Sequence, residues 1–465
     1  MSLQYSYAVK KPIDLPFDLF DYQEAALIKA NTRSGFMYLM DMGLGKTITA
    51  LEDSRQRGSK FTLCIAPAGV HVAWARDSVL KYYSKYYDYI AYYQRGDLRE
   101  LTDKDIKECK NIFISVNYEI LEKSHLLFFV KLIKMLKKTN SFLIIDECHR
   151  IKNRSAKITK TVMKLSDLFS YTRLLSGTPI GNGNQDLYSQ LKIVMKDSLP
   201  FKSFSSFADM FCIYGGFKNK QIIGSKNSQT LKKMLDAWSF IAKKEDCIEL
   251  PPKVYETKYL ELSESGRELY RKAKKKTLEV AGKDMTQAIN QLNMLRNLTS
   301  GLLDGRHIYS AYDENPKLCE VEKILEDHEG KSIIIFVSYV TEGLFLSNYL
   351  GVSFYHGELT SDEKEFVLEL YKNGKEKILV ATVQSLGTGF DLHMTNVIIY
   401  FSNQYSYLLR AQSEDRAHRI GTREPVTIYN LIVENTVDEK IYDCLLKKEN
   451  IADKILKEGF KSFIN

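Results

Sequence analysis

Residues 41–47 read DMGLGKT, and this stretch decides how the sequence around it must fold. Its two glycines let backbone N–H groups close around a phosphate without interference from a Cβ atom, and a helix that begins here points its positive end at the anion. Lys46 then supplies a point charge for the β- and γ-phosphates, and the hydroxyl of Thr47 is placed to bind Mg²⁺. The stretch departs from the strict phosphate-loop pattern, because Met40 stands where the first glycine would be. It predicts nucleotide binding, with a purely structural glycine turn as the alternative.

A second stretch, residues 143–149, reads LIIDECH and places two adjacent carboxylates directly after an apolar strand. Side chains of successive residues diverge at a strand end, so Asp146 can hold Mg²⁺ while Glu147 addresses a water aligned with the γ-phosphate. Two acidic residues in a loop usually do no more than face solvent. An acidic pair that follows a buried strand, downstream of a phosphate loop, usually has a functional role. Because ligands of open α/β sheets bind at the carboxyl ends of the strands, we expect both stretches at one sheet edge. Together they predict hydrolysis of a nucleoside triphosphate.

Short β-branched runs recur outward from these two stretches, each followed by a turn signal and a segment of helical length. Continuous apolar runs of this kind predict parallel strands that are buried on both faces of an α/β layer. The expected strands are residues 61–66, 111–116, 142–145, 173–175, 333–337, 378–381, 397–401 and 426–433. The predicted fold class is therefore α/β, with two parallel-sheet lobes and helical insertions between them.

The runs fall into two groups, and the stretch between them is rich in Lys, Leu and aromatic residues with several helical periods. The expected boundaries are 1–200 for the ATP-binding lobe, 201–310 for the helical insertions and hinge, and 311–465 for the C-terminal lobe. The two lobes are expected to join near residues 250–253, LPPK, because paired prolines fix φ and remove two hydrogen-bond donors.

Composition and charge narrow the class of protein. The 465 residues include 66 Lys and Arg against 58 Asp and Glu, a formal net charge of +8. Apolar residues make up 44% and charged residues 27%, which excludes wholesale disorder. No apolar run is long enough to cross a bilayer, no secretory signal opens the chain, and the seven cysteines are scattered without a C-x-x-C pair. These features predict a soluble cytoplasmic protein without a membrane partner.

The densest basic run is RKAKKK, residues 271–276, within a stretch of helical character over residues 262–298. A solvated helix face and a surface that follows a phosphate backbone are equally compatible with it.

A third motif, QSEDRAHRIG, occupies residues 412–421. Arg416 and Arg419 are three residues apart, so on a helix they share one face. A planar guanidinium suits bidentate phosphate contact, and an arginine finger of this kind can be worth about 10³–10⁵ in rate. The alternative is a salt-bridged surface helix.

The motifs as a set resemble those of superfamily 2 helicases. In chain order these are DMGLGKT (41–47), DECH (146–149), LLSGTP (174–179) and QSEDRAHRIG (412–421). More narrowly, the chain resembles the Snf2-family DNA translocases, on the compact, annealing-helicase or branch-migration side of that family. The narrower resemblance rests on RIKN (150–153), GTPIGN (177–182) and ELPPK (249–253). It implies two RecA-like lobes and a DNA-dependent ATPase.

The resemblance also implies ATP and Mg²⁺ as cofactors and a role for individual residues. The implied nucleotide-binding residues are Gln23, which would read the adenine edge, and Gly43, Leu44, Gly45, Lys46, Thr47, Gly389, Asp391 and Gln412. The implied catalytic residues are Lys46, Glu147, Arg416 and Arg419, with Thr47 and Asp146 at the metal. The implied DNA-contact or coupling residues are Pro67, Ala68, Asn117, Tyr118, Ser176, Thr178, Ser338 and Thr382.

Two positions depart from the family pattern. Asp391 stands where family members often carry Asn, and Gln384 stands where they often carry Arg. A carboxylate at position 391 is expected to weaken phosphate attraction nearby, which affects DNA affinity or coupling.

The resemblance predicts ATP-driven movement on duplex or branched DNA, with fork remodelling, branch migration or reannealing as outputs. The alternatives are a strand-separating DNA helicase, a factor that displaces proteins from DNA through a partner surface between residues 200 and 310, and an RNA-directed helicase. DNA is the expected partner, with a DNA-bound protein as a further one. The compact motor would suit a bacterial or viral genome.

Overall fold

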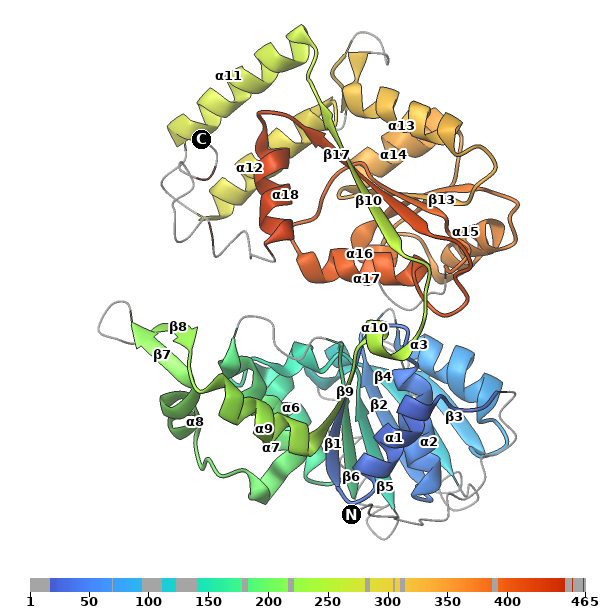
Figure 1. The fold of residues 1–465 in the computed structure, drawn as a ribbon, viewed down its shortest axis with the longest axis vertical. Coiled ribbons are helices and arrows are strands. Elements are labelled where there is room, and N and C mark those ends of the chain that lie inside the picture. The colour runs from blue at the N-terminus through green and yellow to red at the C-terminus, as the bar shows by residue number, and fades with distance from the viewer. Residues whose placement is uncertain are drawn as a thin grey trace. The chain divides into compact units, whose positions relative to one another are not determined.

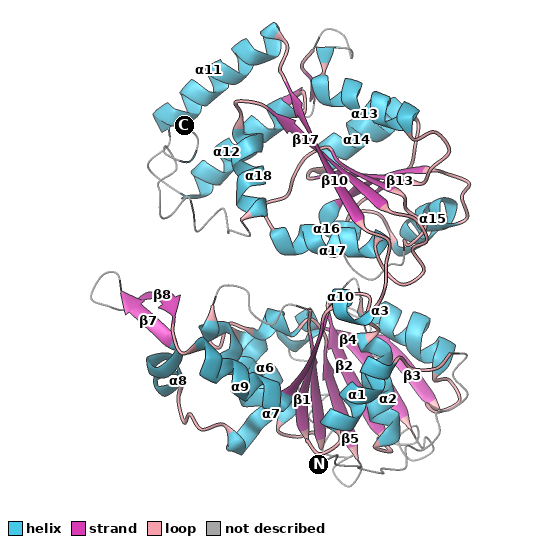
Figure 2. Cartoon of the chain, viewed as in Figure 1, coloured by secondary structure: helices cyan, strands magenta, loops and turns pink. Residues whose placement is uncertain are grey.

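A computed structural model describes residues 17–68, 70–93, 111–122, 140–177, 183–215, 221–280, 285–303, 306–309, 314–386 and 392–447, with Lys454 and Phe463. The chain divides into two compact units, Met1–Ile248 and Glu249–Asn465. Each unit contains a parallel β-sheet with helices on both faces (Figures 1 and 2). The predicted α/β fold class with two parallel-sheet lobes is confirmed.

The sheet of the first unit has the strand order β3-β4-β2-β5-β6-β1-β9, and every neighbouring pair is parallel. Its strands are β1 (Gly35–Met40), β2 (Phe61–Ala66), β3 (Tyr89–Tyr93), β4 (Ile112–Asn117), β5 (Ser141–Ile145), β6 (Tyr171–Leu175) and β9 (Ser239–Ala242). The helices of this unit are α1 (Asp21–Ala30), α2 (Lys46–Gln56), α3 (His71–Ala73), α6 (Lys157–Ser166), α7 (Leu187–Met195), α8 (Phe204–Phe211), α9 (Ser228–Trp238) and α10 (Lys244–Cys247). Shorter helical turns are η1 (Trp74–Leu80), η2 (Tyr118–Glu122), η3 (Cys148–Ile151), η4 (Asn184–Asp186) and η5 (Lys196–Ser198), and β7 (Cys212–Gly215) pairs with β8 (Gln221–Ser225) in an antiparallel hairpin.

Alternation of side chains along the strands builds a core on each face of this sheet. In β1, Met37 and Leu39 join a cluster with apolar residues of α6, α7 and α9, whereas Phe36, Tyr38 and Met40 join a second cluster with residues of α1, α2 and η1. All six residues of β1 are buried. Burial on both faces explains why these strands read as continuous apolar runs rather than as alternating ones.

The sheet of the second unit has the order β10-β17-β16-β13-β15-β14, again with all neighbours parallel. Its strands are β10 (Lys253–Leu260), β13 (Ile333–Val337), β14 (Phe354–Tyr355), β15 (Ile378–Thr382), β16 (Val397–Tyr400) and β17 (Val426–Val433). Its helices are α11 (Glu264–Val280), α12 (Met285–Thr299), α13 (Pro316–Asp327), α14 (Val340–Leu350), α15 (Ser361–Lys372), α16 (Val383–Leu386), α17 (Tyr407–Ala417) and α18 (Val437–Leu446), and β11 (Leu302–Leu303) pairs with β12 (Arg306–His307).

The stretch expected as helical insertions and hinge is divided between the units. Helices α8, α9 and α10 belong to the first unit, and α11 and α12 belong to the second. The division lies beside Pro251 and Pro252, which directly precede β10 rather than interrupting an element. Among the described residues, no helix combines the length and apolar character needed to span a bilayer.

A buried charge cluster fixes α2, the helix that follows the phosphate loop, to the sheet. Nε of Arg173 on β6 lies 2.5 Å from Oδ2 of Asp53 on α2, and the hydroxyl of Tyr38 on β1 donates to the same oxygen at 2.6 Å. Burial would raise the pKa of Asp53, but the charges of Arg173 and Arg57 outweigh it and lower that pKa. The ionised carboxylate therefore holds two strands and a helix together beneath the loop.

We predict that Arg173→Leu lowers the free energy of unfolding by about 3–5 kcal/mol, because it leaves a buried carboxylate short of a cationic partner. Urea denaturation measures this loss. The matched control is Lys272→Ala, which breaks a pair with Glu268 whose side chains are 71% and 65% exposed; it should leave the free energy of unfolding almost unchanged. Equal losses for the two variants would contradict the role given to the cluster.

Candidate nucleotide site

The phosphate loop leaves the carboxyl end of β1 and enters α2. Gly43 and Gly45 adopt φ of +84° and +73°, in the left-handed region that glycine favours. A Cβ atom at Gly45 would lie 2.3 Å from Nε2 of Gln23, so close approach as well as φ requires glycine there. The loop leads into the start of α2, the helix end at which the sequence predicts that an anion binds.

Lys46 begins α2, and its ammonium group lies back over the loop. Nζ donates to the carbonyl oxygens of Met40 at 2.8 Å and Asp41 at 3.1 Å. Asp41 in turn accepts a hydrogen bond from the backbone N–H of Lys244 at 2.9 Å, which ties the loop to the start of α10. The two carbonyl groups therefore hold the positive charge at the loop. A phosphate oxygen could take their place as the acceptor of the Lys46 hydrogen bonds.

Gln23 is almost fully buried and connects α1 to the phosphate loop. Its Oε1 accepts from the backbone N–H of Phe20 at 3.1 Å, and its Nε2 donates to the carbonyl of Leu44 at 3.2 Å. The structure thus places the predicted adenine-reading glutamine directly against the loop, where its amide also supports the loop conformation.

The acidic pair follows β5 at the same edge of the sheet. Oδ1 of Asp146 accepts from the backbone N–H of Glu147 at 3.0 Å, and Oδ2 accepts from Nε1 of Trp74 at 2.9 Å. Burial and the neighbouring charge of Glu147 raise the pKa of Asp146 to about 6, while the indole N–H of Trp74 and the charge of Lys46 act in the opposite direction. A cation bound nearby would therefore favour the ionised form of Asp146, which burial and Glu147 disfavour.

Glu147 itself has a left-handed backbone, with φ +50° and ψ +54°. This conformation costs a non-glycine residue roughly 1–2 kcal/mol. Strain of this kind is often found where a side chain must be aimed for function. Oε2 of Glu147 lies 3.2 Å from Nδ1 of His149 in the helical turn that follows.

The donor set fits a hard divalent cation. A hydroxyl from Thr47 and a carboxylate from Asp146 are oxygen ligands, and Mg²⁺ is usually held by one or two such protein groups together with substrate phosphates. Thr47 lies in the first turn of α2, beside Lys46, whose charge acts on Asp146. These residues would hold the cation.

The coupling and DNA-contact residues predicted for the first unit lie at the ends of neighbouring strands. Pro67 is buried after β2, and Ala68 beside it is exposed. Oδ1 of Asn117 accepts from the backbone N–H of Ile120 at 3.1 Å, and the hydroxyl of Tyr118 donates to the carbonyl of Asp146 at 2.5 Å. These two buried side chains stabilise the fold, so a DNA contact there would fall to the backbone.

Ser176 follows β6 and is fully buried, and its backbone N–H donates to the carbonyl of Tyr38 at 3.2 Å. The predicted residues Thr178, Gly389 and Asp391 lie outside the described residues.

In the second unit, Ser338 and Thr382 lie at the carboxyl ends of β13 and β15. The backbone N–H of Ser338 donates to Oε2 of Glu342 at 3.0 Å, and the hydroxyl of Thr382 donates to Oγ of Ser385 at 2.7 Å. Gln412 is buried on α17. The second sheet thus repeats the arrangement of the first, with predicted contact residues at its carboxyl edge.

The prediction that Arg416 and Arg419 share a helix face is wrong. Helix α17 ends at Ala417, so Arg416 lies in its last turn and Arg419 lies beyond it. The reason is a local cap, because the hydroxyl of Thr422 donates to the carbonyl of Ala417 at 2.8 Å and accepts from the backbone N–H of Arg419 at 3.0 Å. The three-residue spacing did not reveal this cap.

Arg410, which the sequence analysis missed, holds α17 in place. Its Nε donates to Glu414 at 3.1 Å, its other nitrogens donate to the side-chain oxygens of Asn403 and Asn430, and its guanidinium lies 4.0 Å from the ring centroid of Tyr400. Its only sequence signal is an arginine one turn before Glu414.

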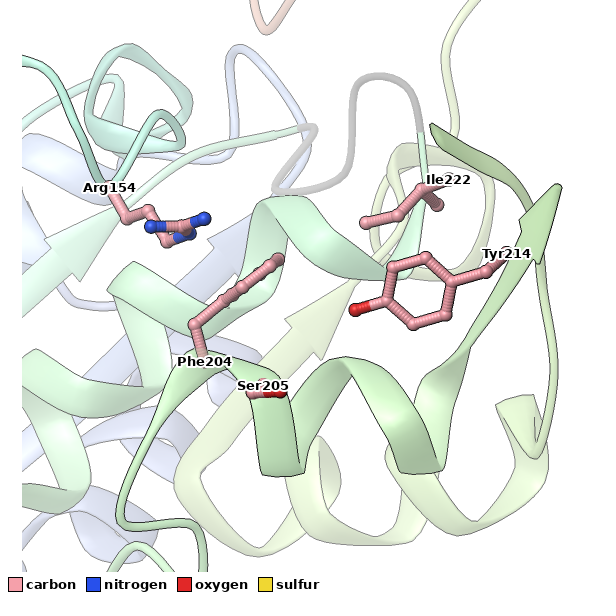
Figure 3. A pocket seen from close by; sticks show the side chains of 5 residues that line it. All are labelled: Arg154, Phe204, Ser205, Tyr214 and Ile222. Atoms are coloured by element: carbon pink, nitrogen blue, oxygen red, sulfur yellow. The ribbon is translucent and has the colours of Figure 1, made fainter. Parts of the chain in front are cut away.

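A separate cavity of about 600 Å³ in the first unit contains none of the predicted site residues. It lies between α8, the β7–β8 hairpin and the loop before α6 (Figure 3), and is lined by Arg154, Phe204, Ser205, Tyr214 and Ile222. The Arg154 guanidinium lies 4.0 Å from the centroid of the Phe204 ring. Four of these residues fall in the segment 200–310 in which a partner surface was predicted, and that partner remains a prediction.

Comparison with known families decides the assignment. The SNF2-related domain matches residues 25–310, and the helicase conserved C-terminal domain matches residues 316–421. This chain belongs to the SNF2-related helicase family. The resemblance to the Snf2 family of superfamily 2 helicases that the motifs indicated is therefore confirmed.

Similar proteins include ATP-dependent helicases and chromatin regulators. An uncharacterized ATP-dependent helicase of Mycoplasma genitalium is 27% identical over 91% of this chain and 40% of its own length. Human SWI/SNF-related matrix-associated actin-dependent regulator of chromatin subfamily A member 1 is 29% identical over 68% of this chain and 32% of its own length. The chain thus spans less than half the length of these SNF2-family relatives.

Among solved structures, the SWI2/SNF2 ATPase core of Sulfolobus solfataricus in complex with dsDNA is similar. It is 23% identical, with a TM-score of 0.44, over 98% of this chain and 96% of that chain.

We predict that Gly45→Ala weakens ATP binding by at least about tenfold, because a tenfold change in affinity requires only about 1.4 kcal/mol and the new Cβ displaces both the loop and Gln23. Isothermal titration calorimetry measures this affinity. Gly58→Ala is the matched control, since Gly58 also has a positive φ of +62° but a Cβ there meets no atom within 4 Å. A similar loss of ATP affinity in the two variants would show that general destabilisation, and not the loop, is responsible.

Proposed function

We propose that this SNF2-family chain hydrolyses ATP and uses the energy to move along duplex or branched DNA. One observation carries the proposal: parallel pairing brings the phosphate loop after β1 and the acidic pair after β5 to the same edge of one sheet. The family match over both units supports it.

The residues of the first unit divide the chemistry of hydrolysis among them. Backbone N–H groups of the loop and the ammonium of Lys46 bind the β- and γ-phosphates, while Thr47 and Asp146 bind the cation. A bound Mg²⁺ neutralises charge that develops on the phosphates. Glu147 orients the attacking water and accepts its proton.

Movement along DNA requires that the affinity of the protein for DNA changes with the state of the bound nucleotide. A ligand can shift such an equilibrium only through contacts that differ between the two states. In this proposal Arg416 and Arg419 are the contribution of the second unit to that difference. Strand-end backbone at the exposed residue Ala68 supplies a phosphate contact, and such contacts position a protein on DNA without reading its sequence.

The exposed basic residues of helix α11 are further support for DNA as the partner. Tyr270 and Thr277 are buried, whereas Arg271, Lys272 and Lys275 lie exposed on the same helix. Thr277 donates to Oε1 of Gln291 on α12 at 2.9 Å, so the basic face is held by the helix pair. Its charge fits a DNA backbone, for which each neutralised phosphate adds to affinity and to salt dependence.

The proposal is tested by steady-state ATPase at fixed salt with no nucleic acid, single-stranded DNA, duplex DNA, a fork, a four-way junction and RNA. We expect strong stimulation by duplex or branched DNA. A preference for forks or junctions over plain duplex would assign the activity to fork remodelling, branch migration or reannealing. Stimulation only by single strands would indicate a strand-separating helicase, and stimulation only by RNA an RNA-directed one. No stimulation by any of them would contradict the proposal.

We further predict that Glu147→Gln lowers the ATPase rate by about 10²–10⁴-fold while ATP still binds, because the amide cannot accept the proton from water. Phosphate release and calorimetric ATP binding measure the two effects. Glu119→Gln is the control, since Glu119 is an exposed residue of the same unit that pairs with Arg150 at 3.4 Å. Unchanged turnover in Glu147→Gln would remove Glu147 from the catalytic role.

A further inference from the structure

The contact between Trp74 and Asp146 joins two segments that are far apart in the sequence. Trp74 is 1% exposed and begins the π-helical turn η1, whereas Asp146 follows β5. The indole Nε1 donates to Oδ2 of Asp146 at 2.9 Å. Trp74 plays no part in the chemistry proposed above.

Two hydrogen bonds, one to each oxygen, hold the carboxylate of Asp146 in one orientation. Its Oδ1 accepts from the backbone N–H of Glu147, which belongs to a strained turn. Its Oδ2 accepts from Trp74. Since the two donors act on different oxygens, together they fix the rotation of the carboxylate group. Hydrogen bonds of this kind to a metal-binding side chain commonly set its orientation.

Trp74 is itself rigidly placed. Its ring packs in the cluster that includes Ala75, Val79 and Tyr83. Its backbone N–H donates to the carbonyl of Val70 at 3.0 Å, and the N–H of Val70 donates to the carbonyl of Pro67 at 2.8 Å. The indole is thus anchored by the turn after β2. Single π-helical turns are frequently found at functional sites, which agrees with a directed tryptophan here.

We propose that Trp74 is a positioning residue that holds Asp146 in the orientation in which it binds the divalent cation of the nucleotide. The inference rests on the proposed function, in that it takes Asp146 as the metal-binding carboxylate. It adds a residue that touches neither nucleotide nor metal and acts only through Asp146.

The test compares Trp74→Phe with Trp238→Phe, because the chain has two tryptophans and this pair makes the same substitution at each. Trp238 lies on α9 with the guanidinium of Arg33 4.3 Å from its ring centroid. Binding of ATPγS is measured calorimetrically over a series of Mg²⁺ concentrations and in EDTA. Trp74→Phe should need about 10-fold or more Mg²⁺ to reach half of its Mg²⁺-dependent gain in affinity, with binding in EDTA unchanged.

Trp238→Phe should keep the Mg²⁺ dependence of the unaltered chain. The inference is overturned if the two variants depend on Mg²⁺ alike, or if Trp74→Phe loses nucleotide affinity equally with and without Mg²⁺, since the second result marks a role in packing alone.

A spectroscopic measurement covers the case in which Trp74→Phe does not fold. In Trp238→Phe the fluorescence comes from Trp74, so ATPγS with Mg²⁺ should change its emission and ATPγS with EDTA should not. Adding Asp146→Asn should abolish the change. An emission that does not respond to Mg²⁺ would overturn the inference. Neither measurement needs DNA or hydrolysis, so absence of DNA stimulation would refute the proposed function and leave this inference standing.

Discussion

Parallel strand pairing in the first unit is the constraint on which the rest of the site depends. In an antiparallel sheet the ends of neighbouring strands alternate between edges, but here β1, β2, β4, β5 and β6 all end at one edge. The phosphate loop, the predicted DNA-contact turns and the acidic pair follow these strands directly. No single motif creates the site. The sheet creates it, because parallel pairing brings residues about a hundred positions apart in the chain, such as Lys46 and Asp146, to the same edge.

The site contains two unfavourable features that stability of the fold alone does not require. Glu147 has a left-handed backbone, and Asp146 is a buried carboxylate beside another acid. The surroundings offset part of the cost: Trp74 donates to Asp146, and the charge of Lys46 acts on it. Beneath the loop, the ion pair of Arg173 and Asp53 holds α2 against the sheet. A rigid support therefore lies beneath a strained, charged edge, where a cation bound as we propose would relieve the repulsion between the two acids.

Sequence patterns predicted those parts of the molecule that are encoded locally. The β-branched runs predicted strands β2, β4, β5, β6, β13, β15, β16 and β17, but β1, β3, β9, β10 and β14 were missed. The sequence of β1, GFMYLM, contains no β-branched residue. The end of α17 was also missed, since Thr422 caps it from beyond the helix. Contacts across the fold left no sequence signal at all. The sequence spacing does not indicate that Trp74 contacts Asp146 or that Arg410 contacts Asn430. These residues meet because of the way the strands are ordered and the helices pack in the fold.

We propose that ATP hydrolysis at this edge drives movement along duplex DNA, and a third-strand displacement assay detects such movement. A labelled oligonucleotide bound as a triplex at one end of a duplex is released only if the protein moves through it, and the duplex strands need not separate. We expect release of the third strand with ATP and Mg²⁺, no release with ATPγS, and an intact duplex afterwards. Full ATPase stimulation by duplex DNA without third-strand release would contradict it, because hydrolysis would then not be coupled to movement.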